Sequence, residues 1–528
     1  MRPLAVDYAF DYARLSDFFA GDPSDARSWV GAIERARSHP RPRSAVADLL
    51  TAQQRARHAP AEALAATARL RDEATVAVVT GQQAGLFGGP LFTLLKALTA
   101  VKLAEDVATR HKTPVVAIFW IDAEDHDWQE VRECAVLDAE DGLHAISAGD
   151  PPGAQVAAVG HVRLDESIGD TLRTLEATLP PTEFTSHLLE GLRRAYQPGV
   201  SMADACARWL DTVLGPRGLI VYNAADPAAK PLVSGVFTRE IESRGDTSRL
   251  ALRAGAALEG RGYHAQATPQ ESGLALFRFD HGRQAIRQQD EQTFVVGDRP
   301  LSMSELLALV RQSPEDFSPS VLLRPIVQDT LFPTVGYVSG PSELAYLGQL
   351  KDVYALFGVP MPLIVQRATA TILDSNAMRF LTRHEFPLEA LRARDEAALN
   401  ELLGSQLPAG IDAAVTRLDQ SIVEQMEALA SAVKAVDATL EGAAQSTRGR
   451  MQDDVQKLHG KIIQAAKRKD TTLRRQFQHA QQQAFPGGQP QERAIGFAYF
   501  LNRYGPALVD RLSDVLPGAP GTHYVLTI

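Results

Sequence analysis

The chain contains few cysteines: only Cys134 and Cys206 among 528 residues, with no CxxC pair. A disulfide framework or a zinc-thiolate cluster needs several closely spaced cysteines, so the sequence favours neither, and we predict no metal ligands. It also lacks a run of about eighteen apolar residues, which predicts no membrane-spanning helix and no membrane partner. The N-terminus reaches Asp7 without an apolar stretch, so we expect no signal peptide and a cytoplasmic protein.

An excess of basic residues is missing as well. The formal charge is −10 and the isoelectric point is near 5.8. Contacts to phosphate backbones need a basic face, so no nucleic-acid partner is expected for the whole chain. The content of 45% hydrophobic and 22% charged residues is typical of a globular protein, and the length predicts about three domains.

The phosphate-binding patterns GxxxxGK[ST] and GxGxxG do not occur in the most informative segment, a glycine-rich loop. Val76–Thr80 is predicted to be a strand and Leu91–Ala104 a helix. Between them the backbone can approach an anion at Gly81, Gly85, Gly88 and Gly89. We predict that these glycines, with Gln82 and Gln83 at the loop apex, bind substrate or nucleotide. A tight structural turn is the alternative.

Acidic residues surround a histidine after the next predicted strand, residues 114–121. Glu124, Asp125 and Asp127 flank His126 at the carboxyl end of that strand. Carboxylates so close together raise one another's pKa, and a neighbouring histidine can act as an acid or base. We predict these four residues to be catalytic, with Glu124 and His126 on one side of the chain. Alternatively, Asp125 or Asp127 caps the following helix.

A third polar segment lies near residue 330. We predict a strand at 321–327, a second strand after it, and then a helix with Ser342 as its N-cap. The side chains of Tyr337, Ser339 and Ser342 are predicted to line the same crevice as the glycine loop. Arg324 is either a clamp for a substrate carboxylate or a buried structural partner, and the sequence does not separate the two.

Apolar strands alternating with helices, interrupted twice, predict a doubly wound α/β core with two insertions. The predicted boundaries are core 1–128, insertion 129–182, core 183–225, insertion 226–318, core 319–385, arm 386–484 and C-terminal return segment 485–528.

The predicted arm is a coiled-coil hairpin. Two sets of apolar residues are spaced alternately by four and three positions: Ile422, Met426, Leu429, Val433, Val436 and Leu440, then Met451, Val455, Leu458, Ile462 and Ala465. This is the heptad pattern of a coiled coil, and we expect the turn between Val436 and Gly449. A long amphipathic helix folded onto the core is the alternative.

At these motifs the chain resembles the bacillithiol biosynthesis cysteine-adding enzymes, also called cysteine ligases. The resemblance spans essentially the whole chain and rests on five segments: Gly81-Gln82-Gln83-Ala84-Gly85-Leu86-Phe87-Gly88-Gly89-Pro90-Leu91, Phe119-Trp120-Ile121-Asp122-Ala123-Glu124-Asp125-His126-Asp127, Leu323-Arg324-Pro325-Ile326-Val327-Gln328-Asp329, Tyr337-Val338-Ser339-Gly340-Pro341-Ser342-Glu343 and Phe500-Leu501-Asn502-Arg503-Tyr504-Gly505-Pro506.

The resemblance implies a Rossmann-like core related to class I aminoacyl-tRNA synthetases, two connecting insertions and a coiled coil that supports a homodimer. It implies the last step of bacillithiol biosynthesis, in which cysteine is joined through its carboxyl group to the amine of glucosaminyl malate. ATP or another adenine nucleotide is the implied co-substrate, bound outside the main cleft. Asn502 and Tyr504 are implied to bind substrate or nucleotide.

One departure from the synthetase pattern concerns the mechanism. Class I synthetases carry paired histidines in the first strand–helix turn, where this chain has Gln82 and Gln83. An adenylate intermediate is therefore an inference from the resemblance. The alternative functions are a metal-dependent group transferase or hydrolase on the same core, and a dimeric scaffold that binds a nucleotide.

Overall fold

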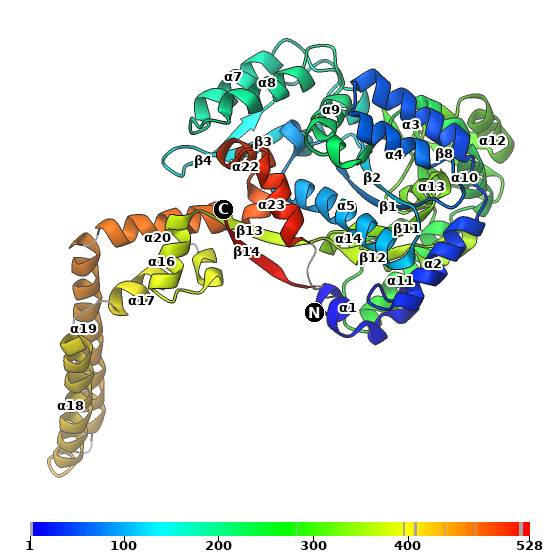
Figure 1. The fold of residues 1–528 in the computed structure, drawn as a ribbon. Helices are drawn as coiled ribbons and strands as arrows, with labels where there is room; N and C mark the ends of the chain where they lie inside the picture. Colours follow the sequence, from blue (N-terminus) through cyan, green and yellow to red (C-terminus); the bar gives the residue numbers. More distant parts are fainter. Residues whose placement is uncertain are drawn as a thin grey trace. The chain divides into compact units, whose positions relative to one another are not determined.

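The valine-rich runs of the sequence form the centre of a parallel sheet. The strands β1 (Val76–Gln83) and β2 (Val115–Asp122) are buried over nearly their whole length. They are joined by β5 (Ile220–Asn223), β11 (Thr334–Ser339) and β12 (Leu363–Gln366) in the order β12-β11-β1-β2-β5. Every neighbouring pair is parallel (Figure 1). A strand covered on both faces needs apolar residues at every position, which explains the unbroken runs.

The structure is a computed structural model that describes residues 4–280, 282–393, 397–405, 409–437, 439–469, 471–516 and 521–528. The chain divides into two units. The first comprises Met1–Thr371 and Glu492–Tyr524, and the second comprises Ile372–Gln491 and Val525–Ile528.

Helices cover the parallel sheet within the first unit. Val79 and Ile118 share one apolar cluster with Leu50 of α3 (Arg43–Arg57) and Ala66 of α4 (Ala61–Arg69). Helix α5 (Leu91–His111) connects β1 to β2 and packs on both strands. The helices before and between the first strands are α1 (Leu4–Phe10), α2 (Ala26–Ser38), α3 (Arg43–Arg57), α4 (Ala61–Arg69), α5 (Leu91–His111) and α9 (Met202–Leu214). Later helices are α10 (Lys230–Ser243), α11 (Asp246–Gly260), α12 (Met303–Gln312), α13 (Arg324–Leu331), α14 (Pro341–Leu347), α15 (Lys351–Phe357), α21 (Gln491–Ala494), α22 (Phe497–Tyr504) and α23 (Ala507–Val515).

Two antiparallel sheets lie in the segments predicted as insertions, except that the second sheet ends at Pro319, one residue beyond 226–318. The boundaries of the insertions stay predictions. The hairpin of β3 (Glu133–Leu137) and β4 (Leu143–Ser147) follows the short helix α6 (Trp128–Val131) and precedes α7 (Ile168–Thr178) and α8 (Thr185–Ala195). The second sheet has the order β10-β6-β7-β8-β9, with β6 (Gly273–Phe279), β7 (Arg283–Gln288), β8 (Thr293–Val296), β9 (Arg299–Ser302) and β10 (Phe317–Pro319). The strands from β6 to β9 pair in sequence order as antiparallel hairpins.

The strand predicted at 321–327 is wrong, because the chain forms helix α13 from Arg324 to Leu331. Pro325 lies in the first turn of this helix, where its missing N–H costs nothing; inside a sheet it would remove a ladder hydrogen bond. The prediction of Ser342 as an N-cap is also wrong. Helix α14 is capped at Gly340, whose N–H donates to the Glu343 carboxylate over 2.7 Å.

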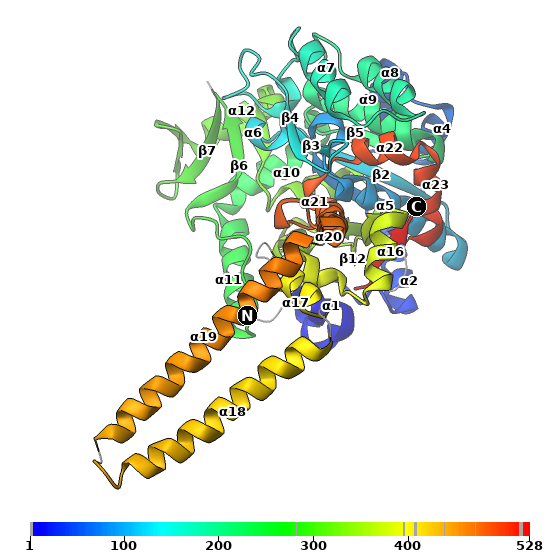
Figure 2. The same ribbon diagram turned by 90° about the vertical axis from the view of Figure 1, so that its left-hand side faces the viewer.

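The second unit contains a helical hairpin, visible in Figure 2 as the two long helices α18 (Ala409–Val433) and α19 (Leu440–Lys469). They run antiparallel, because Glu427 pairs with Arg448 and Asp412 with His459. The other elements of this part of the chain are β13 (Thr369–Leu373), α16 (Ser375–Arg383), α17 (Ala397–Ser405), α20 (Thr471–Ala484) and β14 (His523–Thr527), with β13 paired to β14.

The heptad positions divide between two faces of this hairpin. Ile422 is buried, and Met426 and Val433 are half-buried. Leu429 is exposed. The turn of the hairpin begins directly after Val433 and includes Val436, so it starts earlier than the predicted range from Val436 to Gly449.

Among the described residues, no helix is long and apolar enough to cross a membrane.

Candidate functional site

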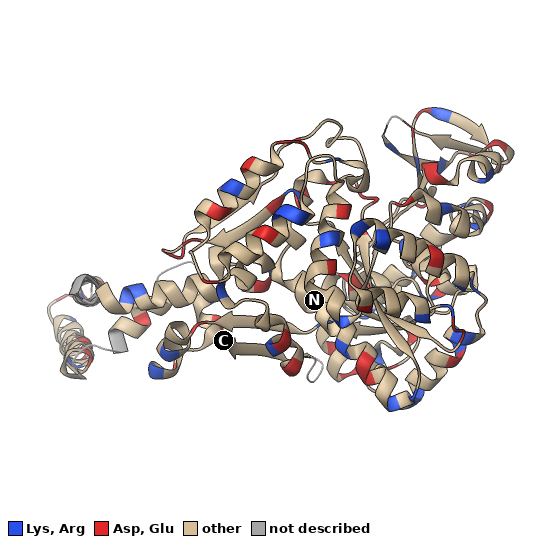
Figure 3. Ribbon diagram, turned by 45° about the horizontal axis from the view of Figure 1, so that its top comes forward, with Lys and Arg blue, Asp and Glu red and all other residues tan. Residues whose placement is uncertain are grey.

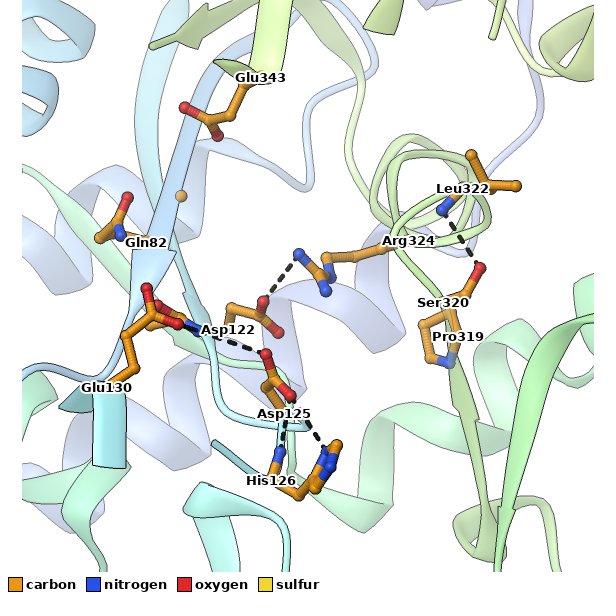
Figure 4. A network of polar contacts seen from close by, with 12 residues as sticks. Gln82, Asp122, Asp125, His126, Glu130, Pro319, Ser320, Leu322, Arg324 and Glu343 are labelled. Carbon is orange, nitrogen blue, oxygen red and sulfur yellow. Dashed lines mark hydrogen bonds and ion pairs between the residues drawn. The ribbon is translucent and has the colours of Figure 1, made fainter. Parts of the chain in front are cut away.

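The carboxyl ends of β1, β2 and β11 open into a cavity of about 410 Å³ in the first unit. Parallel strands of an α/β fold place ligands at this edge of the sheet. The polar and charged side chains that line the cavity are Gln82, Gln83, Lys96, Asp122, Asp125, Glu130, Arg324, Gln328, Tyr337, Ser342, Glu343, Tyr346, Tyr354, Arg367 and Arg493. Part of this polar network is drawn in Figure 4.

The end of β1 provides one wall of the cavity. Register places Gln82 beside Ile121 and Gln83 beside Asp122, so both glutamines reach the edge of the sheet together with the acidic segment. The Gln83 amide donates to Glu130 over 2.8 Å and to Asp125 over 3.3 Å. Gly81 also lines the cavity. Gln82 and Gln83 were predicted at the apex of the loop, and this is wrong, because they are the last two residues of β1. Their ligand stays a prediction.

The later glycines of the loop form a turn that packs against the protein. Gly88 and Gly89 have φ values of +90° and +80°, which L side chains rarely adopt. A Cβ on Gly88 would lie 2.2 Å from the Phe497 ring. Gly85, Gly88 and Gly89 are not among the described residues that line the cavity, so the structural alternative fits these three glycines.

Lys96 projects from α5 into the base of the cavity, and the sequence analysis did not identify it. Its ammonium donates to the Glu343 carboxylate over 2.6 Å and to the carbonyl of Gly81 over 2.5 Å. The side chain is 1% exposed. Burial lowers the pKa of Lys96, while the charge of Glu343 opposes this shift. Glu343 also accepts a hydrogen bond from the Tyr337 hydroxyl over 2.8 Å.

Arg324 and Asp122 form an ion pair of 2.7 Å across the cavity, from α13 to the last residue of β2. This ion pair fits the interpretation of Arg324 as a structural partner. Its guanidinium still lines the cavity, so contact with a substrate remains open to it.

Asp125 is the member of the acidic segment that lines the cavity. In Figure 4 it lies between His126 and the Asp122–Arg324 pair. Burial raises the pKa of its carboxyl, but the backbone N–H of His126 and the charges of Arg283 and Arg324 outweigh burial and hold the pKa below its ordinary value. Asp125 is therefore ionised near neutral pH.

The other members of this segment point elsewhere. Glu124 is buried and forms an ion pair with Lys230 of α10. Asp127 accepts from the N–H of Glu130 and caps α6, which confirms the capping alternative for this residue. The His126 ring contacts Asp125 at 3.3 Å, is 56% exposed, and is not among the described residues that line the cavity. The expected shared side for Glu124 and His126 is wrong, because the chain leaves extended geometry after Asp122.

The remaining predicted residues are divided between two places. Tyr337 and Ser342 line the cavity, whereas Ser339 is buried beside them. Asn502 and Tyr504 lie on α22, and neither belongs to the described lining of this cavity. The Asn502 amide donates to the carbonyl of Pro180 over 2.8 Å. Contact of Asn502 and Tyr504 with substrate or nucleotide stays a prediction.

Comparison with known proteins places the whole chain in one family. Residues 1–368 match the family described as bacillithiol biosynthesis BshC, N-terminal Rossmann-like domain. Residues 370–528 match bacillithiol biosynthesis BshC, C-terminal coiled-coil domain. The chain belongs to the BshC family.

Several curated relatives, each named "Putative cysteine ligase BshC", align over most of their length. The relative from Salinibacter ruber is 34% identical over 99% of this chain and 96% of its own length. The relative from Chlorobaculum tepidum is 34% identical over 85% of this chain and 82% of its own. The relative from Geobacillus thermodenitrificans is 30% identical over 92% and 90%. The family resemblance seen in the sequence is confirmed, as are its Rossmann-like and coiled-coil domains.

In this BshC family member, six charged cavity residues were not predicted as site residues from the sequence: Lys96, Asp122, Glu130, Glu343, Arg367 and Arg493. Lys96 did carry a signal, as the one charge within the apolar stretch Leu94–Leu98 of a predicted helix. The local sequence around Arg367 and Arg493 carries no such signal, because only the fold brings these two residues together. Their guanidinium groups lie 5.4 and 5.8 Å from the centre of the Phe92 ring. Among the described residues, no group of three or more His, Cys, Asp or Glu side chains is placed to hold a metal ion.

Proposed function

We propose that this protein is a ligase that joins the carboxyl group of cysteine to the amine of glucosaminyl malate, the last step of bacillithiol biosynthesis. The observation that carries the proposal is a cavity with both signs of charge at the carboxyl edge of the sheet, in a chain whose relatives are named cysteine ligases. Both proposed substrates carry an amine and a carboxylate, so both signs are needed to bind them.

Amide formation from a free carboxylate is unfavourable in water, so the proposal includes activation of cysteine by ATP or another adenine nucleotide. A second cavity of about 470 Å³ in the first unit supports a nucleotide outside the main cleft. Its lining includes the rings of Phe184 and Trp209, on which a purine can stack, together with Arg194 and Arg217. Leu501 of α22, next to Asn502, also lines this second cavity.

The proposed acid–base role of His126 depends on Asp125. The Asp125 carboxylate lines the cavity and also contacts the imidazole, so it connects His126 to a bound amine. Exchange of His126 for alanine tests the role directly: turnover equal to that of the unmodified protein would remove His126 from the mechanism.

The proposal extends to architecture and cell biology. We place the core with the class I aminoacyl-tRNA synthetase folds, with insertions at 129–182 and 226–318. Acidic and basic residues alternate along the helices of the ribbon (Figure 3), which suits a small-molecule enzyme better than a nucleic-acid-binding protein. Cys134 and Cys206 are both buried free thiols, in keeping with the reducing cytoplasm.

We also propose a homodimer formed through the coiled coil. The hairpin has two exposed apolar stripes with spacings of eleven and seven residues. One comprises Leu418 and Leu429 on α18 with Val436 in the turn that follows, and the other comprises Leu440, Met451 and Leu458 on α19. Such a stripe is the seam along which helices of a second copy pack.

The direct experiment supplies purified protein with cysteine, glucosaminyl malate and ATP, and detects the thiol product by mass spectrometry. We expect product to form only when all three substrates are present. Omission of ATP without loss of product would refute nucleotide activation. Absence of product under all conditions, with protein shown to be folded, would refute the ligase proposal.

A further inference from the structure

The charged side chains that line the main cavity are largely paired with one another or with a neighbour. Lys96 pairs with Glu343, Arg324 with Asp122, and Arg367 with Glu492 just behind the wall. Asp125 has Arg283 at 3.9 Å and the His126 ring at 3.3 Å. Paired charges are neutralised locally and offer a substrate little net attraction.

Two lining residues remain outside this pairing. Glu130 accepts a hydrogen bond from the neutral amide of Gln83, over 2.8 Å, and has no ion pair with any described residue. Arg493 lies over the Phe92 ring, and among the described residues it too has no carboxylate partner. The adjacent acid, Glu492, is already held by Arg367 through contacts of 2.9 and 2.6 Å. The cavity thus presents one unneutralised anion and one unneutralised cation.

Both groups are placed to meet a ligand without a large desolvation cost. Glu130 on α6 and Arg493 on α21 are exposed, yet each contributes to the cavity wall. Phe92 holds the Arg493 guanidinium at the cavity by cation–π contact, beside the fixed guanidinium of Arg367. A guanidinium in this position can bind a carboxylate through two parallel hydrogen bonds.

We propose that Arg493 and Glu130 determine specificity for the acceptor substrate, with Arg493 binding the malate carboxylates and Glu130 the ammonium group of the sugar. The inference rests on the proposed ligase function and adds a place and an orientation for the acceptor. It leaves Arg324 and Lys96 for the other substrate or for structure, and it keeps Asp125, which shares the Gln83 amide with Glu130, beside the acceptor amine. The acceptor then spans the cavity between α6 and α21.

The experiment varies acceptor concentration at saturating cysteine and ATP, with two acceptors: glucosaminyl malate, and methyl glucosaminide, which has the amine but no malate. Arg493→Gln should raise KM for glucosaminyl malate at least tenfold and leave its kcat within twofold. It should leave the kinetics of methyl glucosaminide unchanged. Arg493→Lys, which keeps the charge, should lie between. Arg35→Gln, a loss of one exposed arginine on α2, is the matched control and should change nothing.

The glutamate is tested through the amine. Glu130→Gln should raise KM for glucosaminyl malate at least fivefold, but should not alter inhibition by the same acceptor with its amine acetylated. Glu34→Gln, at an exposed position on α2, is the control. Arg493→Gln that affects both acceptors equally, or neither, would overturn the assignment of Arg493. Glu130→Gln that weakens the acetylated acceptor as much as the free amine would overturn that of Glu130.

Binding measured by calorimetry separates failure of this inference from failure of the proposed function. Glucosaminyl malate alone should bind the unmodified protein and lose at least tenfold in affinity with Arg493→Gln. If Arg493→Gln lowers the affinity tenfold but the protein forms no thiol product, the acceptor site is supported and the ligase reaction is refuted. If the protein forms thiol product but Arg493→Gln leaves the acceptor affinity unchanged, the ligase reaction is supported and the acceptor site is refuted.

Discussion

The ammonium nitrogen of Lys96 lies 2.6 Å from the carboxylate of Glu343, which joins α5 to α14 at the base of the main cavity. The lysine is buried, so its charge depends on this partner. Glu343→Gln should lower the free energy of unfolding by about 3 kcal/mol, because it leaves an uncompensated buried cation. Chemical denaturation at neutral pH measures the change.

A double variant provides the control for this pair. Lys96→Met combined with Glu343→Gln removes both charges and should be more stable than Glu343→Gln alone, by about 2 kcal/mol. Equal stability of the single and double variants would show that the lysine charge costs nothing when unpaired, contrary to its burial.

The same pair shows how far the sequence can predict the site. The order of strand, glycine loop and helix is predictable because β1 and β2 are buried on both faces and rich in valine, which gives a strong local signal. Lys96 is predicted only as part of the helix. Its importance depends on Glu343, which is 247 positions away, and only the parallel pairing of β1 with β11 brings the two together.

The errors in the sequence interpretation have a similar origin. The run at 321–327 is as apolar as a strand, and Pro325 is the one local residue that favours a helix start instead. For His126, the prediction extends the alternation of an extended chain past Asp122, where the strand ends. Contacts such as Glu124 with Lys230 are set by tertiary packing and leave no pattern in the local sequence.

Gly88 is predicted to be far less tolerant of alanine than Gly199, although both have positive φ, +90° and +80°. A Cβ on Gly88 meets the Phe497 ring at 2.2 Å and Trp209 at 2.9 Å, whereas nothing lies within 4 Å at Gly199. Gly199→Ala should cost roughly 1 kcal/mol from backbone strain alone. Gly88→Ala should cost roughly 3 kcal/mol or more, because the rings must also move. Equal melting temperatures of the two variants would contradict the packing described for the loop.

Glu240 should make stability depend on pH. The side chain is fully buried on α10 and accepts hydrogen bonds from Thr247 and from the N–H of Ala275. Burial raises the pKa of Glu240 from 4.5 to about 7. The folded chain therefore holds this proton more tightly than the unfolded chain, and the stability it gives is lost as pH rises from about 4.5 to 7.

Glu240→Gln removes this titration. Relative to the unmodified protein, the variant should gain about 3 kcal/mol of unfolding free energy between pH 4.5 and 7, at 1.36 kcal/mol per pKa unit. Urea denaturation at a series of pH values measures the difference. Glu259→Gln, at an exposed position on α11, should follow the unmodified protein at every pH. Parallel curves for Glu240→Gln and the unmodified protein would show that Glu240 titrates normally in the folded chain.

The exposed stripes of the coiled coil should decide the oligomeric state. Leu429, in the middle of one stripe of apolar side chains, is 49% exposed, and Leu458, at the end of the other stripe, is 54% exposed. If a second copy covers them, the double variant Leu429→Glu with Leu458→Glu places two charges in an apolar interface and should dissociate the dimer. Gln425→Glu with Gln464→Glu adds the same charge at exposed positions of the same two helices and should leave it intact. Light scattering after gel filtration distinguishes one chain of 57.2 kDa from twice that mass. An unmodified protein that elutes as a single chain, or a leucine double variant that stays dimeric, would exclude this seam as the interface.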